Sequence, residues 1–152
     1  MAHGKLVFDL PAGGTEAFEA FFNHGIRLTW DTLLDVNYVE GGGTHPYVGA
    51  ITMNQGRGWK TALSMRTRFL TYDPPHHASA VLVEPMGPFA QWGASMRFVD
   101  EGERRCTMTY TFTVHLRPPW VGKLLDPLAG MLFRRETRRR FAAMAQHLRK
   151  TS

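Results

Sequence analysis

The sequence predicts an α+β fold in which a curved, seven-stranded antiparallel sheet wraps around a long C-terminal helix, with two short helices after the first strand. Three observations predict it. Residues 34–117 form one strand pattern after another, separated by short turns. Residues 105–117 alternate polar and apolar side chains without a break. From residue 121 onward the apolar spacing changes to three and four, which is typical of an amphipathic helix.

The composition describes a chain that can bury a core. It has 152 residues, 43% of them apolar, and we expect one domain over residues 1–152. A single cysteine excludes an internal disulfide framework. No apolar run precedes Pro11, and no stretch approaches the roughly 20 apolar residues of a membrane span. We therefore expect a cytoplasmic protein without a transmembrane segment.

The first 33 residues predict one strand and two short helices. Leu6, Phe8 and Leu10 alternate with polar neighbours and define a strand that ends at Pro11. Thr15 is the expected N-cap of a first helix, which ends at the Asn-His-Gly sequence of residues 23–25. A second helix is expected over residues 26–33.

The middle of the chain predicts six further strands, each ended by glycine- or proline-rich turns. The last of them, residues 105–117, places Cys106, Met108, Tyr110, Phe112 and Val114 on one face and threonines on the other. This is the pattern of a strand with one buried and one wet face. The other expected strands span residues 34–38, 47–53, 59–72, 77–84 and 89–99.

The closing helix is predicted over residues 121–148 and is the one element long enough to cover the sheet, at about 1.5 Å per residue. Pro127 lies inside it, after Asp126. Either Pro127 kinks the helix, or Asp126 caps a second helical segment that begins with proline.

The basic charge is concentrated in this helix. Residues 134–150 hold seven basic residues and one acid, whereas the rest of the chain is nearly neutral. A solvated face, nucleic-acid binding and attraction to an anionic surface would each explain this charge. The sheet lacks a matching basic stripe, so we expect no nucleic acid among the partners. The face from Arg134 to Arg140 is left as a possible weak contact with anionic surfaces.

Several features in order resemble one superfamily. Trp30 follows the paired short helices, an Asp-Pro-Pro sequence closes a long middle strand at residues 73–75, and Arg-Pro-Pro at 117–119 leads into the final helix. Gly122, Pro127, Phe141 and Leu148 continue the pattern. The whole chain thus resembles the START-like or SRPBCC superfamily, most of all its polyketide cyclase/dehydrase-type lipid-binding branch. The resemblance implies the helix-grip fold, and a cavity for apolar ligands between sheet and helix. It carries over no catalytic motif.

The predicted ligand-binding residues are large apolar side chains on the inward parity of the strands and on the closing helix. Methionine and aromatic side chains beside small ones can leave a pocket of a few hundred Å³, although a filled core would use the same residues. The candidates are Leu34, Val36, Tyr38, Met65, Phe69, Trp92, Met96, Met108, Tyr110, Phe112, Leu128, Met131 and Leu132.

Evidence for catalysis in the sequence is limited to hydroxyl groups. Tyr38 and Tyr110 could orient a ligand or move a proton, but no inward carboxylate is evident. The histidines lack metal-ligand spacing, so no metal and no cofactor are expected. Cys106 has no neighbouring base and is interpreted as a core residue.

Three functions therefore remain open. The first is binding of a small hydrophobic or amphipathic, lipid- or polyketide-like molecule. The second is a cyclase or aromatase acting in the same cavity, and the third is an interaction module that uses the basic helix. Ligand identity, catalytic residues and oligomeric state stay undetermined.

Overall fold

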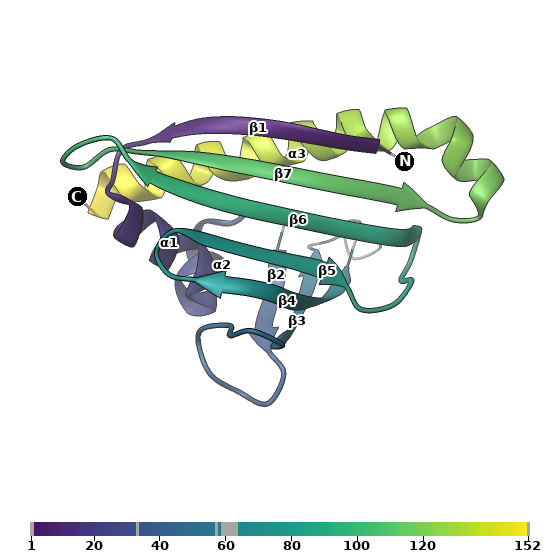
Figure 1. Ribbon diagram of the computed structural model, residues 1–152, viewed down its shortest axis with the longest axis horizontal. Helices are drawn as coiled ribbons and strands as arrows, with labels where there is room; N and C mark the ends of the chain where they lie inside the picture. Colours follow the sequence, from purple (N-terminus) through teal and green to yellow (C-terminus); the bar gives the residue numbers. More distant parts are fainter. Residues whose placement is uncertain (1, 33, 57, 59–63, 152) are drawn as a thin grey trace.

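Neighbouring strands of the sheet are all antiparallel, in the order β1-β7-β6-β5-β4-β3-β2. The computed structural model describes residues 2–32, 34–56, 58 and 64–151. Figure 1 shows the curved sheet with α3 (Pro119–Thr151) running along it, which confirms the predicted fold class. The strands are β1 (Ala2–Leu10), β2 (Leu34–Val39), β3 (Ile51–Gly56), β4 (Met65–Asp73), β5 (His77–Leu82), β6 (Phe89–Asp100) and β7 (Cys106–Leu116).

The alternating strand β7 lies between β1 and β6, so the first and the last strand of the chain are neighbours in the sheet. Its apolar positions are buried, as the alternation predicts: Met108 and Phe112 are at most 1% exposed. Register shifts in three strand pairs, one of them between Leu34 and Val36 of β2, interrupt the regular pairing. Such bulges bend and twist a sheet, which suits a sheet that curves around a helix.

The two short helices are α1 (Gly14–Phe22) and α2 (His24–Trp30). The predicted cap at Thr15 is wrong: the N-cap is Gly13, two residues earlier, and the Gly14 N–H donates to the Asp100 carboxylate at the end of β6, at 2.6 Å. The expected break at residues 23–25 is also wrong in part. Asn23 instead caps α2, because its side chain accepts a hydrogen bond from the Ile26 N–H. The second helix therefore begins and ends earlier than predicted.

Two predicted strands, over residues 47–53 and 59–72, have clearly different boundaries in the structure. The first begins only at Ile51. Residues 54–56 are not a turn, because they complete β3 and pair with β2. The pairing of β3 with β2 and β4 overrides the local turn preference of the Asn-Gln-Gly sequence. The predicted strand over 59–72 corresponds to β4 from Met65 onward, while residues 59–63 lie outside the described residues.

Helix α3 continues through Pro127 as one element, and Figure 1 shows it bending in the first part, as a proline kink would produce. Asp126 does not cap a second segment. Its carboxylate accepts a hydrogen bond from the Leu116 N–H at 3.1 Å and contacts His115 Nδ1 at 2.8 Å. Burial would raise the pKa of Asp126, but hydrogen bonds, these two among them, hold it below the usual value. Asp126 thus joins the start of α3 to the end of β7.

The two halves of α3 are in different environments. The C-terminal half packs on the sheet and on α1 through Phe141, Met144 and Leu148, each at most 1% exposed. In the N-terminal half a second set of large apolar side chains lies on the other side of the helix and faces solvent: Trp120, Leu124, Leu125, Leu128, Met131 and Leu132 are 43–72% exposed. We call this second set the apolar half of α3.

The core fills one end of the space between the sheet and α3. Phe18, Phe21 and Phe22 of α1 pack in tilted and edge-to-face contacts against one another and against rings from α2, β4, β6 and α3, with ring centroids 4.4–6.1 Å apart. The Trp30 indole N–H donates to the Ala20 carbonyl at 2.8 Å, which ties α2 to α1. The other end of the same space, toward Leu116 and Phe89, holds the candidate site.

Candidate functional site

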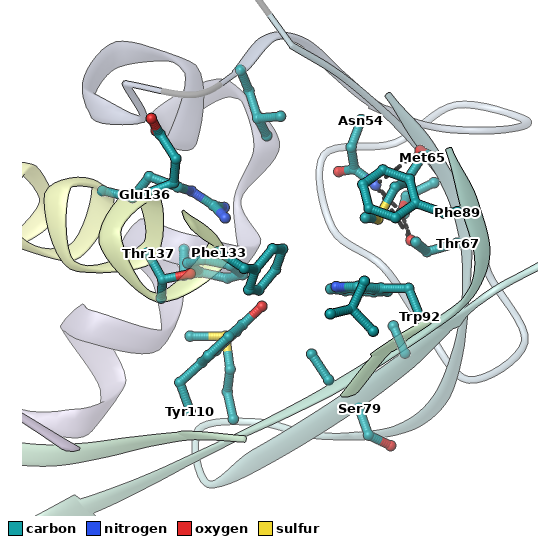
Figure 2. Close-up of a pocket in the computed structure, with 18 of the residues that line it drawn as sticks. Asn54, Met65, Thr67, Ser79, Phe89, Trp92, Tyr110, Phe133, Glu136 and Thr137 are labelled. Carbon is teal, nitrogen blue, oxygen red and sulfur yellow. Dashed lines mark hydrogen bonds between the residues drawn. The ribbon is translucent and has the colours of Figure 1, made fainter. Parts of the chain in front are cut away.

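A cavity of about 520 Å³ lies between the concave face of the sheet and the helices α2 and α3. Figure 2 shows Phe133 and Tyr110 on one side of it and Trp92 and Phe89 on the other, with an open space between them. Small residues of β5 and β6, including Ala78, Ala80 and Ala94, also line the wall. Large aromatic side chains next to alanines leave the space unfilled.

Seven of the thirteen predicted ligand-binding residues lie in the cavity wall. They come from four strands and from α3, so the fold brings together positions that are up to 98 residues apart in sequence. The seven are Leu34, Met65, Phe69, Trp92, Met96, Tyr110 and Leu132.

The other six predicted residues do not line the cavity. Met108 and Phe112 face inward but are buried in the core of the sheet. Tyr38 is 49% exposed, and its predicted inward orientation is wrong because the register shift between Leu34 and Val36 changes which side chains face the cavity. Val36 is half-buried and outside the wall. Leu128 and Met131 belong to the apolar half of α3 and face solvent outside the wall, at 51% and 68% exposed.

A polar corner on β3 and β4 interrupts the apolar wall. Thr52 Oγ1 and Thr67 Oγ1 are 2.7 Å apart and both side chains are buried. The Asn54 side-chain amide donates to Thr67 Oγ1 at 3.3 Å, and its oxygen accepts from the Asn37 amide at 2.5 Å. Figure 2 shows Asn54, Met65 and Thr67 grouped at this part of the wall. The corner adds hydroxyl and amide groups to a wall that is mostly apolar.

Two titratable groups in the wall are neutral at pH 7. Burial, followed by repulsion from Arg27 and His45, lowers the pKa of His24 to about 4. Burial also raises the pKa of Tyr110 to about 12, in spite of the neighbouring Arg140 and Arg27. Figure 2 shows the Tyr110 hydroxyl pointing into the cavity between Phe133 and Trp92. His24 was predicted to lie in a loop, but it begins α2 and faces the cavity.

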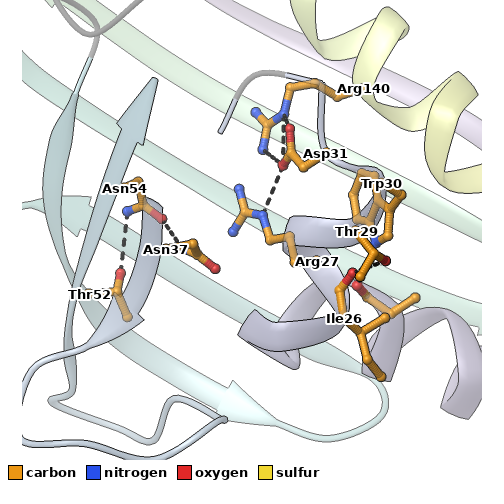
Figure 3. A network of polar contacts seen from close by, with 10 residues as sticks. Ile26, Arg27, Thr29, Trp30, Asp31, Asn37, Thr52, Asn54 and Arg140 are labelled. Carbon is orange, nitrogen blue, oxygen red and sulfur yellow. Dashed lines mark hydrogen bonds and ion pairs between the residues drawn. The ribbon is translucent and has the colours of Figure 1, made fainter. Parts of the chain in front are cut away.

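A buried ion network closes the inner end of the site. Arg140 Nε and Nη2 donate to the two oxygens of Asp31 at 3.0 Å, and Arg27 Nε donates to Asp31 Oδ2 at 3.0 Å. Figure 3 shows Asp31 between the two guanidinium groups. Arg140 is only 5% exposed and lines the cavity, so it does not belong to the solvated basic face predicted over residues 134–140.

Sequence reasoning missed Arg27, Asp31 and Arg140 as members of the site. The one available signal was the spacing of Arg27 and Asp31, four residues apart on one turn of helix, which favours an ion pair. Arg140 looked like its four basic neighbours, because nothing in the local sequence marks which arginine of a run turns inward.

The sequence matches the family described as "Polyketide cyclase / dehydrase and lipid transport" over residues 1–149. The chain belongs to this family. Its match spans all elements from β1 into the last turns of α3, and it includes the cavity wall and the ion network. No curated protein matches the sequence significantly.

Members of the START superfamily share the fold of this family member. A START superfamily protein from Mycobacterium smegmatis aligns with a TM-score of 0.77 at 10% identity, covering 99% of both chains. Norcoclaurine synthase from Thalictrum flavum, in complex with dopamine and hydroxybenzaldehyde, aligns at 0.68 and 14% identity over 99% of this chain and 88% of that one. The di-domain ARO/CYC protein BexL of the BE-7585A biosynthetic pathway aligns at 0.70 and 12% identity, over 96% and 46%. These likenesses establish the fold alone.

Other candidate sites are weaker in the described part of the chain. No three His, Cys, Asp or Glu side chains there lie close enough together to hold a metal ion. Burial raises the pKa of Cys106 to about 11, so the thiol stays protonated at neutral pH. No helix among the described residues has the length and apolar character needed to cross a membrane.

Proposed function

We propose that this protein binds a small apolar or amphipathic molecule in the cavity between the sheet and α3. One observation carries the proposal: about 520 Å³ stays open inside the fold although large aromatic side chains surround it. Cavities of a few hundred Å³ with mostly apolar walls and a few placed polar groups are typical of small-molecule sites. Thr67, Asn54 and Tyr110 are polar groups of this kind here.

The rival hypothesis is that the protein is a cyclase or aromatase that acts in the same cavity. Its main support is the similarity in fold to norcoclaurine synthase and to the ARO/CYC protein BexL. General acid–base catalysis favours groups whose pKa lies near the working pH. The pKa of His24 is about 4 and that of Tyr110 is about 12, so both values lie far from pH 7. These values support a binding role over proton transfer at pH 7.

Replacing Trp92 by alanine tests the proposal. We expect the neutral fluorescent probe N-phenylnaphthylamine to bind the wild-type protein and to lose about tenfold in affinity in Trp92→Ala, because the wall loses a large apolar surface. Fluorescence titration measures both affinities. Native mass spectrometry of the purified protein would show a co-purifying molecule directly.

Trp120→Ala is the matched control, because Trp120 is 68% exposed and lies outside the cavity. Its probe affinity should equal that of the wild type. A wild-type protein that does not bind the probe, or an equal loss in both variants, would contradict the proposed cavity.

A second candidate function, contact with an anionic membrane, is favoured by the solvent-facing side of α3. This side is apolar over its first half and basic over the next turns, where Arg135, Arg138 and Arg139 are exposed. Apolar residues next to arginines match the two parts of a lipid surface, its acyl boundary and its anionic head groups. Leu132, Arg135 and Arg139 also line the cavity, so its mouth would face the membrane.

Vesicle co-sedimentation tests this second function. Arg138→Gln with Arg139→Gln should weaken binding to phosphatidylglycerol vesicles roughly 30-fold, at about 1 kcal/mol for each arginine near the surface. Arg68→Gln with Arg97→Gln, two exposed arginines of β4 and β6, should not change it. Equal binding to purely zwitterionic vesicles, or dimerisation that buries the apolar half of α3, would refute the membrane contact.

A further inference from the structure

The two arginines at the inner end of the cavity are not equally paired. Two buried guanidinium groups, Arg27 and Arg140, share the single carboxylate of Asp31. Arg140 binds both oxygens of Asp31, whereas Arg27 reaches only one of them through Nε. Arg27 is therefore the less completely paired of the two arginines.

Other groups near the network leave Asp31 as the acidic partner of Arg27. Glu136 also lines the cavity, but it pairs with Arg139 at 3.5 Å, and its charge acts on Arg140. Tyr110 lies near Arg27, yet burial keeps its phenol protonated at neutral pH. Among the described side chains, Asp31 is the only acid within ion-pair distance of Arg27.

The Arg27 guanidinium is placed to meet a ligand. The residue is 9% exposed and lines the cavity, and its carbon lies 4.1 Å from the centre of the Phe21 ring, which fixes the plane of the group. Nε is used by Asp31, and Figure 3 shows the rest of the guanidinium turned away from Asp31, toward Asn37 and Asn54. Burial, followed by repulsion from Arg140, lowers the pKa of Arg27 to about 10, which still leaves it charged at pH 7.

We infer that the ligand is an amphiphile with one carboxylate, and that this carboxylate pairs with Arg27 while the apolar part lies against Trp92 and Phe133. The inference rests on the proposed binding function and adds the chemical class of the ligand. A buried, incompletely paired cation is costly, and a carboxylate meets the planar guanidinium with two hydrogen bonds. A carboxylate brings one negative charge to the one incompletely paired arginine, whereas a phosphate monoester carries about −1.5 to −2 at neutral pH.

Competition between ligands that differ in one group tests the inference. Lauric acid, lauryl alcohol and lauryl phosphate share the same chain and can each be titrated against bound N-phenylnaphthylamine at pH 7.5. For the wild type we expect lauric acid to bind at least tenfold more tightly than lauryl alcohol, as a hydrogen bond to a charged group allows, and more tightly than lauryl phosphate.

Substitution of Arg27 tests whether this residue causes the preference for lauric acid over lauryl alcohol. Arg27→Met should remove the preference for the acid and leave the alcohol affinity within about twofold, because Asp31 keeps its two bonds to Arg140. Arg27→Lys, which retains the charge, should keep part of the preference even if Arg27→Met fails to fold. Arg97→Gln, an exposed arginine of β6, is the control and should behave as the wild type.

The outcomes separate this inference from the proposed function. Equal affinities of acid and alcohol in the wild type would overturn the carboxylate and leave the cavity as a binding site. Tighter binding of lauryl phosphate, or an acid preference that survives in Arg27→Met, would also overturn it. Failure of all three compounds to displace the probe, or of the probe to bind, would refute the proposed function itself.

Discussion

Asp31→Asn should lower the free energy of unfolding by about 3–5 kcal/mol, the cost of breaking a buried ion pair from one side. Asparagine has nearly the same shape as aspartate, so the change removes charge and leaves the packing in place. Two buried guanidinium groups, of Arg27 and Arg140, would then repel each other without the carboxylate between them. Because domains are stable by only about 5–15 kcal/mol, this is a large part of the total.

Urea denaturation followed by circular dichroism measures the effect. Asp35→Asn, an exposed aspartate at the start of β2, is the matched control and should change the unfolding free energy by no more than about 0.5 kcal/mol. In the double variant Asp31→Asn, Arg140→Met, one of the two unpaired charges is removed, so part of the stability should return. If Asp31→Asn and Asp35→Asn were equally stable, the network would not hold α2 against α3.

Phe112→Ala should lower the free energy of unfolding by about 3–5 kcal/mol, as is usual for a phenylalanine removed from a packed core. Phe112 is 1% exposed, and its ring centroid lies 4.7 Å from that of Phe133 on α3. On the other side, a Cβ at Gly4 of β1 would lie only 2.9 Å from Phe112. The surroundings on strand β1 and helix α3 are held by hydrogen-bonded backbone, so they cannot close the void.

The control is Tyr38→Ala, because Tyr38 is 49% exposed on β2. We expect it to change the free energy of unfolding by less than about 1 kcal/mol, well below the effect of Phe112→Ala. Thermal and urea unfolding of both variants give the comparison. A large loss in Tyr38→Ala together with a small one in Phe112→Ala would mean that β2 presents its other face to the interior.

Regular strands could be interpreted from the sequence because their side chains alternate with a period of two. The alternation alone correctly predicts that Met65 and Phe69 of β4, Met96 of β6 and Tyr110 of β7 face the cavity. The same reasoning failed at Tyr38, since a register shift lies between Leu34 and Val36 and the pairing with β3 creates it. Odd and even positions of a strand predict which side chains face inward only as far as the strand pairing is regular.

Helical spacing was less informative for α3. The apolar residues of its first half and those of its second half each recur at three and four residues, yet they lie on different sides of the helix. Asp126 and Thr137, polar residues, occupy the buried side, where they are at most 2% exposed. A spacing of three or four is satisfied by either side, so local periodicity could not say which one the sheet covers.

Local sequence thus specified the succession of strands, the closing helix and the fold class, because turn residues and short periodicities act over a few neighbouring positions. Only the tertiary structure decided three features of the site. These are the open cavity, the burial of Arg140 and the incomplete pairing of Arg27. Asp31 and Arg140 are 109 residues apart, and the local sequence around either residue does not indicate that they pair. Packing between distant segments decides which polar groups are buried together, and this part of the candidate site follows from it.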